Sequence, residues 1–225
     1  MSRHDISADS PAPHAGPICV ARLRDGVVVL DIASNHYAGL YLPTSDPCAD
    51  PRQDVVDALC AHGIGGAPGE GFSIHDGNRD RRHWQDCEPD PDARLRARDV
   101  LVFLSALLLA SVRFHVRPFR TLVTRQQRDI VPVVGLAHHR AALARFERLS
   151  SWLPFRPLCL FRAHFLVHVL RCYGLSADWI FGVSLFPFHA HCWIAVGDHL
   201  LGDRAEKTED YVPILSIINT RMLPA

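Results

Sequence analysis

The sequence lacks net charge, since 24 lysine and arginine side chains balance 24 aspartate and glutamate side chains. A nucleic-acid-binding protein normally carries an excess of basic residues that neutralises phosphates, and no basic block supplies one here. Hydrophobic residues make up 48% of the 225 positions, enough for one large or two small folded domains. We therefore expect a globular protein with no nucleic-acid partner.

The chain also lacks a disulfide framework. Its seven cysteines are odd in number and include no Cys-x-x-Cys pair, which argues against both paired disulfides and structural zinc. Residues 1–17 contain no basic region followed by an apolar stretch, so they do not form a signal peptide. These features predict a cytoplasmic protein, with residues 1–16 as a disordered tail.

No apolar run reaches the roughly 20 residues needed to cross a bilayer. The most apolar segment, 100–112, is bounded by Arg98 and Arg113. We interpret it as a buried helix and expect no membrane span.

Sequence motifs for a cofactor are absent. There is no Gly-x-x-x-x-Gly-Lys-[Ser/Thr] phosphate loop, so any nucleotide requirement stays open. His164 and His168 have metal-ligand spacing on one predicted helix, but the Glu of His-Glu-x-x-His is missing between them. Core histidines are the favoured interpretation, and we predict no metal site.

The first organised block covers residues 17–75. Three β-rich runs at 18–23, 27–32 and 37–42 are separated by turn residues, which predicts a three-stranded meander. A helix over 51–62 follows, with Pro at its first position and Gly63 at its end. Glycines punctuate the segment after it, and we interpret residues 76–92 as a linker.

The second block covers residues 93–225. Helical patterns at 93–115, 119–129, 136–149 and 158–174 precede β-rich runs at 179–185, 190–196 and 199–203. Helices followed by an antiparallel sheet, behind a small β domain, make the predicted fold class α+β.

Three residues in this second block suggest an active site. Cys159 opens the helix at 158–174, where the positive helix end lowers a thiol pKa. His191 and Asp203 follow on the last two β-rich runs, as a base and the group that orients it. A three-residue loop at 196–198 sets His191 opposite Asp203, whereas a strict two-residue loop puts them on opposite faces. The hypothesis therefore requires the longer turn.

The neighbours of these residues carry weaker signals. Trp193 alternates onto the face of His191 and is expected to shield the pair from water. Cys172 and Cys192 are favoured as core residues. Arg162 is either a solvated helix residue, which is favoured, or a cation that steadies the site.

The motifs around the trio resemble a known family. They are LCLFR at 158–162, LRCYGL at 170–175, FGV at 181–183 and PFHAHCWI at 187–194, ending in Asp203. Over about 95–203 they are similar to the lasso-peptide B proteins, which are transglutaminase-like cysteine proteases. The front block, with VVVLDI at 27–32 and YAGL at 37–40, is similar to the winged-helix-like leader-recognition domain of such proteins.

The resemblance implies a function for each part. Residues 17–75 would bind the leader of a lasso-peptide precursor, and 93–225 would form the transglutaminase/papain-like protease. Cys159 would cleave the leader through a thioester, with His191 as base and Asp203 as its orienter, and an asparagine-synthetase-like cyclase would receive the core peptide. The residues expected to contact the substrate are Trp193 and Phe188 near the scissile bond, and Val28, Leu30, Tyr37 and Leu40 along the leader.

Two other functions fit the same residues. Water and an amine compete for one thioester, so the trio also fits an acyl transferase. If the trio is idle, the chain is a non-catalytic module that delivers a peptide to another enzyme.

Overall fold

The computed structural model describes residues 18–24, 26–41, 51–61, 72–76, 82–126, 131–132 and 135–221. The predicted tail at 1–16 lies outside these residues. The chain divides into two compact units. One contains the residues up to 81 with 182–190 and 211–215, and the other contains the rest. The fold is α+β, as the sequence predicted.

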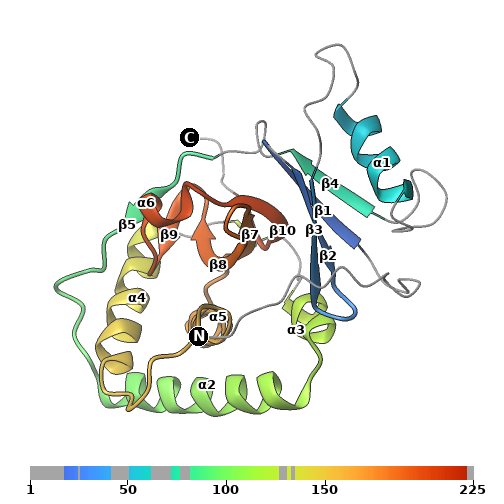
Figure 1. Cartoon of the computed structure of the whole chain (residues 1–225). Coiled ribbons are helices and arrows are strands. Elements are labelled where there is room, and N and C mark those ends of the chain that lie inside the picture. The colour runs from blue at the N-terminus through green and yellow to red at the C-terminus, as the bar shows by residue number, and fades with distance from the viewer. Residues whose placement is uncertain are drawn as a thin grey trace. The chain divides into compact units, whose positions relative to one another are not determined.

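The N-terminal sheet is a meander with one added strand (Figure 1). Its strand order is β3-β2-β1-β4, with β1, β2 and β3 antiparallel and β4 parallel to β1. The elements are β1 (Ile18–Leu23), β2 (Gly26–Asp31), β3 (His36–Tyr41), α1 (Pro51–Ala61) and β4 (Phe72–Asp76). The meander and helix were predicted, but β4 was not. Its apolar alternation is limited to Phe72 and Ile74, and the glycines around them favour a loop over a strand.

The register of this sheet separates the residues predicted to contact the leader. Val27 belongs to the core that includes Val55 and Leu59 of α1, and its partner Leu40 packs against that core. Val28 and Leu30 lie on β2 as Val27 does, but their side chains point to the opposite face of the sheet and are fully buried. Tyr37 pairs with Leu30 and shares that face, so the predicted contact residues do not form one surface.

The second unit contains the helices α2 (Ala97–Val116), α3 (Phe119–Gln126), α4 (Leu136–Ser150) and α5 (Cys159–Cys172). Of these, α2 and α4 pack against α5. Residues 163–170 of α5 are all buried, and Figure 1 shows this helix end-on between α2, α4 and the sheet. Phe103, Phe146 and Phe165 join the three helices, with ring centroids 4.9–6.1 Å apart. This aromatic cluster holds α5, and hence its N-terminus, in place.

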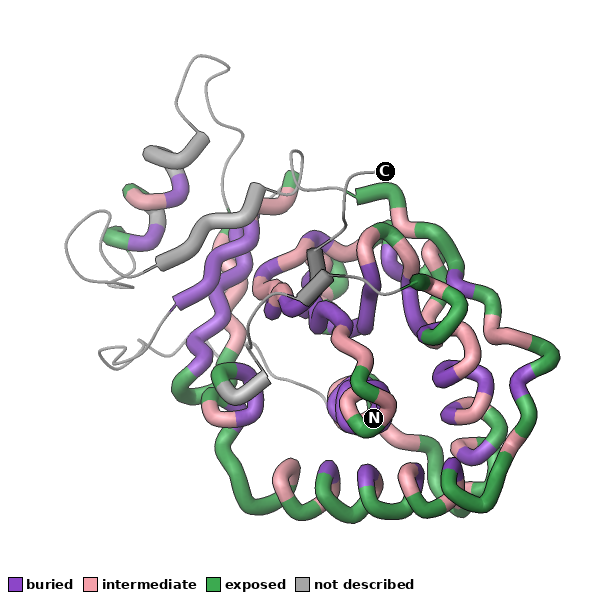
Figure 2. Tube along the Cα trace, turned by 180° about the vertical axis from the view of Figure 1, so that it is seen from behind, coloured by how far each residue is buried: buried purple, intermediate pink, exposed green. Residues whose placement is uncertain are grey.

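The prediction that 100–112 is a buried helix is wrong for most of its surface. Phe103, Ala106 and Ala110 are buried, but Leu101 is 68% exposed and Leu108 is 67% exposed. Figure 2 shows exposed residues along most of α2. The segment is apolar on all sides, and composition alone does not reveal that only one side meets α5.

Length and composition alone would allow α2 to cross a membrane, since it has 20 residues and a mean hydropathy of 1.8. The apolar run at 100–112 is shorter than α2 because Arg98 and Arg113 bound the run, whereas the helix includes both arginines. Asp99 in its first turn is buried and accepts a hydrogen bond from the Tyr173 hydroxyl at 3.0 Å. One such helix is weak support for a membrane span, because a core helix passes the same test.

The C-terminal sheet is mixed, not purely antiparallel. Its strand order is β10-β7-β8-β9-β5, and its strands are β5 (Gln85–Cys87), β7 (Asp178–Ser184), β8 (His189–Val196), β9 (His199–Leu201) and β10 (Val212–Ile217). β8 and β9 form an antiparallel hairpin, but β5 runs parallel to β9. β5 lies within the predicted linker at 76–92. A three-residue strand is too short for an apolar alternation to show.

The remaining elements are short. They are β6 (Val131–Pro132), α6 (Ala205–Thr208) and β11 (Thr220–Arg221), and β6 pairs with β11. Of these, α6 matters for the site because it begins two residues after Asp203.

Candidate active site

Cys159 lies at the first position of α5. The residue before it, Leu158, makes no side-chain cap, and the first helical turn contains no acidic residue. The N–H groups at this end have no intrahelical partner, so the positive end of the helix dipole acts on the thiol. Because Cys159 is exposed while the following turns of α5 are buried, the helix presents its thiol at the surface.

His191 and Asp203 form a hydrogen-bonded pair. His191 Nε2 lies 2.5 Å from Asp203 Oδ2, and both side chains are largely buried. His191 comes from β8 and Asp203 from the loop after β9. The contact to Nε2 leaves Nδ1 as the ring nitrogen on the other side of the imidazole.

The loop geometry predicted for this pair is wrong. Val196 pairs with His199, so the β8–β9 turn is the two-residue Gly197-Asp198. The strands still bring His191 to Asp203, because β9 ends at Leu201 and Gly202 has a φ of 71°. This left-handed residue turns Asp203 out of the strand register. Alternation along β9 therefore does not apply to Asp203.

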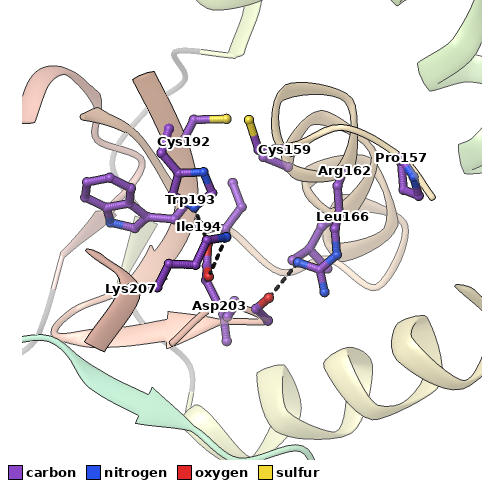
Figure 3. Close-up of a pocket in the computed structure, with 13 residues that line it drawn as sticks. Pro157, Cys159, Arg162, Leu166, Cys192, Trp193, Ile194, Asp203 and Lys207 are labelled. Carbon is purple, nitrogen blue, oxygen red and sulfur yellow. Dashed lines mark hydrogen bonds and ion pairs between the residues drawn. The ribbon is translucent and has the colours of Figure 1, made fainter. Parts of the chain in front are cut away.

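The Asp203 carboxylate is held on its other oxygen as well. Oδ1 accepts a hydrogen bond from the backbone N–H of Arg204 at 3.0 Å. It also accepts one from Lys207 Nζ at 3.4 Å (Figure 3). Sequence reasoning missed Lys207, although Asp203 and Lys207 have the i, i+4 spacing of a helical ion pair. These contacts fix which oxygen faces the imidazole.

Arg162 is not the solvated residue that the sequence favoured. Its Nη1 donates a 2.6 Å hydrogen bond to the Gly202 carbonyl, and its Nη2 lies 3.6 Å from Glu147 Oε1. The guanidinium also stacks 5.7 Å from the Phe146 ring centroid. Arg162 thus ties the helix of the cysteine to the loop of the aspartate. A contact forty residues away leaves no trace in the local sequence.

A pocket of about 270 Å³ lies around these groups. It brings together the trio, Trp193 and nine residues that sequence reasoning did not assign to a site. The lining residues are Pro157, Cys159, Arg162, Ala163, Leu166, His191, Cys192, Trp193, Ile194, Leu201, Gly202, Asp203 and Lys207. Phe188 does not line this pocket. It lies in the turn before β8, ahead of the extended segment that carries His191.

Trp193 packs against the imidazole. The Trp193 and His191 rings are 6.0 Å apart at an interplanar angle of 30°, and Trp193 is 1% exposed. Trp193 also meets the Trp84 ring in a T-shaped arrangement, with ring centroids 6.1 Å apart. Two residues apart on β8, the two rings share a face, as the alternation predicted.

The thiol of Cys159 is strongly acidic. Hydrogen bonds from the Cys192 thiol and from His191 lower the pKa of Cys159 from 9.0 to about 4, against the opposing effect of burial. The charge of His191 and the backbone N–H of Cys192 act in the same direction. At neutral pH the group is therefore a thiolate, which is the nucleophilic form.

The pKa values of His191 and Asp203 shift in the directions that an ion pair requires. Burial lowers the pKa of His191, but its hydrogen bonds to Asp203 and Cys159 outweigh burial, and the net pKa is raised. Burial raises the pKa of Asp203, but the hydrogen bond and charge of His191 lower it overall. A thiolate, an imidazolium and a carboxylate therefore coexist near neutral pH.

Cys192 belongs to this site, and its interpretation as a core residue is incomplete. It is 4% exposed, yet it lines the pocket and hydrogen-bonds the Cys159 thiol. In Figure 3 the two sulfurs point toward each other. Alternation along β8 separates the side chains of His191 and Cys192 but does not show where a side chain from another element lies.

The paired histidines of α5 lie apart from this chemistry. His164 and His168 are buried with ring centroids 4.6 Å apart. Burial lowers the pKa of His164 to about 4, with help from Arg113 and Arg171. Within the described residues, no three His, Cys, Asp or Glu side chains are grouped as a metal site.

Replacing Gly202 tests the turn that aims Asp203. Gly202→Ala should lower the free energy of unfolding by about 1–2 kcal/mol, because alanine disfavours positive φ. The new Cβ would also lie 3.0 Å from Arg162 Nη2 and 3.2 Å from Leu143 Cδ1, which should displace Asp203 and slow Cys159 alkylation. Urea unfolding and the alkylation rate at pH 6.5 measure the two effects.

Gly174→Ala is the matched control. Gly174 has a φ of 73° at the end of α5, with nothing within 4 Å of an added Cβ. It should lose a similar free energy of unfolding and keep the wild-type alkylation rate. Equal slowing in both variants would contradict the role given to Gly202.

The acidity of Cys159 predicts an unusual pH profile. A thiol is deprotonated above its pKa, so iodoacetamide should alkylate Cys159 at a constant rate from about pH 5 to 8 and half as fast near pH 4. His191→Ala removes two of the interactions that lower this pKa. For each unit by which the pKa of Cys159 then exceeds the assay pH, the thiolate fraction falls about tenfold. Mass spectrometry of the Cys159 peptide gives the rate, and an unchanged profile in His191→Ala would refute the pairing.

Comparison with known proteins adds the family. The family model of the transglutaminase-like superfamily matches residues 100–216, more than half of the chain. Comparisons with the curated proteins and with the solved structures gave no match. The matched segment contains α5, β8 and β9, and so all of Cys159, His191 and Asp203. The chain belongs to the transglutaminase-like superfamily.

Proposed function

We propose that this chain is a cysteine peptidase that removes the leader from a lasso-peptide precursor. The transglutaminase-like domain is compatible with cysteine peptidase or acyl-transfer chemistry. The observation that carries the proposal is the hydrogen-bonded Cys159, His191 and Asp203 set in an open pocket. The leader substrate follows from the resemblance of 158–203 and 27–40 to lasso-peptide B proteins.

The first half of the reaction releases the core peptide. The Cys159 thiolate attacks the carbonyl carbon at the leader/core junction, forming a carbon–sulfur bond. The imidazolium of His191 then gives its Nδ1 proton to the leaving amine as the peptide bond breaks. The uncapped N–H groups at the start of α5 are placed to stabilise the oxyanion.

The second half regenerates the enzyme. Neutral His191 takes a proton from water, which attacks the thioester carbon and releases the leader as a carboxylic acid. The Cys159 thiolate and the imidazolium re-form. Asp203 stays ionised throughout and holds the ring through Nε2.

Leader recognition is assigned to the edge of the N-terminal sheet. Among the described strands, β3 pairs only with β2, whereas β2 is paired on both sides. An extended peptide can add to such an edge through main-chain hydrogen bonds. Tyr37 and Leu40 lie on β3 and are half-buried, so they are the better placed of the four predicted leader contacts.

The remaining partners follow from the same proposal. The freed core peptide would pass to an asparagine-synthetase-like cyclase, and both proteins would work in the cytoplasm. Acyl transfer is the competing outcome at the thioester, since an amine and water attack the same carbon.

Substitution of the trio tests the reaction. With a full-length precursor, Cys159→Ala should abolish leader removal and leave leader binding unchanged. His191→Ala should be nearly as inactive, whereas Asp203→Asn should retain slow cleavage because the base remains. Cys172→Ala, at the far end of α5, is the matched control. Turnover by Cys159→Ala would end the proposal, and mass spectrometry with an added amine would show whether hydrolysis or acyl transfer wins.

Backbone methylation of the leader tests strand addition. A leader bound to the β3 edge points alternate N–H groups at that strand. N-methylation at those positions should raise the Kd by roughly fivefold or more, since each lost hydrogen bond costs about 1 kcal/mol. Methylation at the positions between them should change the Kd little. A scan by fluorescence anisotropy with no two-residue period would contradict this binding mode.

A further inference from the structure

We propose that Cys192 is a resolving thiol that captures oxidised Cys159 in a reversible intramolecular disulfide. The pair is a modification site distinct from the peptidase chemistry, which does not use Cys192 as a reacting group. Its effect on leader removal rests on the proposed function, but disulfide formation itself rests only on the two thiols.

The placement of the two sulfurs carries the proposal. Cys159 begins α5 and Cys192 lies in the middle of β8, yet their side chains meet in one pocket (Figure 3). Each thiol shifts the pKa of the other, since Cys192 lowers the pKa of Cys159 and Cys159 raises the pKa of Cys192. The other cysteines in the described part of the chain are Cys19, Cys60, Cys87 and Cys172, and none of them lines this pocket.

The two thiols differ in the ways that the two steps require. Cys159 is exposed and is a thiolate at neutral pH, so a peroxide reaches and oxidises it first. Cys192 is buried, and the hydrogen bond and charge of Cys159, together with burial, raise its pKa well above 9.0. It is therefore protected from direct oxidation while Cys159 remains a thiolate.

Oxidation of Cys159 removes that protection. Conversion of the thiolate to a neutral sulfenic acid eliminates the negative charge that opposes ionisation of Cys192. The imidazole of His191, which hydrogen-bonds Cys159, stands beside the pair as a proton acceptor. Cys192 then becomes a better nucleophile at the moment when its neighbour becomes an electrophile.

The chemistry balances with hydrogen peroxide as the oxidant. The Cys159 thiolate attacks one peroxide oxygen, the O–O bond breaks, and the hydroxide that leaves takes a proton to become water. The Cys192 sulfur then attacks the Cys159 sulfur, the S–O bond breaks, and a second water leaves with the Cys192 proton. Two thiols are oxidised by two electrons and one peroxide is reduced to two waters. A dithiol such as dithiothreitol reverses the step.

Peptide mapping of the full chain tests the proposal. The fully reduced protein is treated with increasing hydrogen peroxide, alkylated and digested without reductant. We expect the intact protein to lose two hydrogens and the Cys159 and Cys192 peptides to be recovered as one linked species. Dithiothreitol should restore alkylation of Cys159 to the untreated level. These measurements use no substrate, so they stand whether or not the chain removes a leader.

Two variants sharpen the result. In Cys192→Ala the same treatment should add two or three oxygens to Cys159, and dithiothreitol should not restore its alkylation. Cys172→Ala should behave as wild type. Because Cys192 is buried, Cys192→Ala is used only if its circular dichroism spectrum and unfolding curve match those of wild type. If they do not match, the peptide map of the wild-type protein alone tests the proposal. Oxygenated Cys159 beside a free Cys192 thiol in the wild-type protein, or a link from Cys159 to another cysteine, would overturn the proposal.

Discussion

The site depends on the hydrogen bond between His191 and Asp203. It joins two segments whose strand register would keep them apart, and it forms only because Gly202 breaks the register after Leu201. Arg162 holds the Gly202 carbonyl from the helix that carries Cys159. One arginine thus couples the nucleophile's helix to the loop of the orienting carboxylate, so the geometry of three elements is set together.

The electrostatics of the site arise locally in a chain with no net charge. An uncapped helix end, an imidazolium and a neighbouring thiol stabilise the Cys159 thiolate. Asp203, which Lys207 and the backbone of Arg204 hold in place, stabilises the imidazolium. Partial burial strengthens each of these interactions by excluding water. The same arrangement makes Cys159 easy to oxidise, and the buried Cys192 lies where it can respond.

The two units are suited to different tasks in the proposed function. The N-terminal sheet has a core of β-branched and leucine side chains against α1 and an edge strand, β3, that suits main-chain recognition. The second unit concentrates aromatic residues around α5, where packing determines the position of a reactive group. Recognition by backbone hydrogen bonds tolerates varied side chains, whereas catalysis needs fixed ones.

The sequence by itself determined the N-terminal meander, the main helices and the β8–β9 hairpin, and it indicated the trio. Periodicity placed α2 to α5 and the hairpin strands to within a few residues, because local backbone preference and an apolar face leave a local pattern. It also indicated Cys159 at a helix start and Trp193 on the face of His191. Both inferences depend only on neighbouring positions in one element.

Tertiary structure alone decided contacts between elements distant in sequence. Arg162 and Gly202, Cys159 and Cys192, the exposed side of α2 and the pairing of β5 with β9 all join or separate such elements. Apolar composition does not tell which side of α2 is covered, and strand alternation ends where Gly202 takes a positive φ. A local sequence pattern shows which face of an element is apolar. Packing in the tertiary structure determines which other element covers that face.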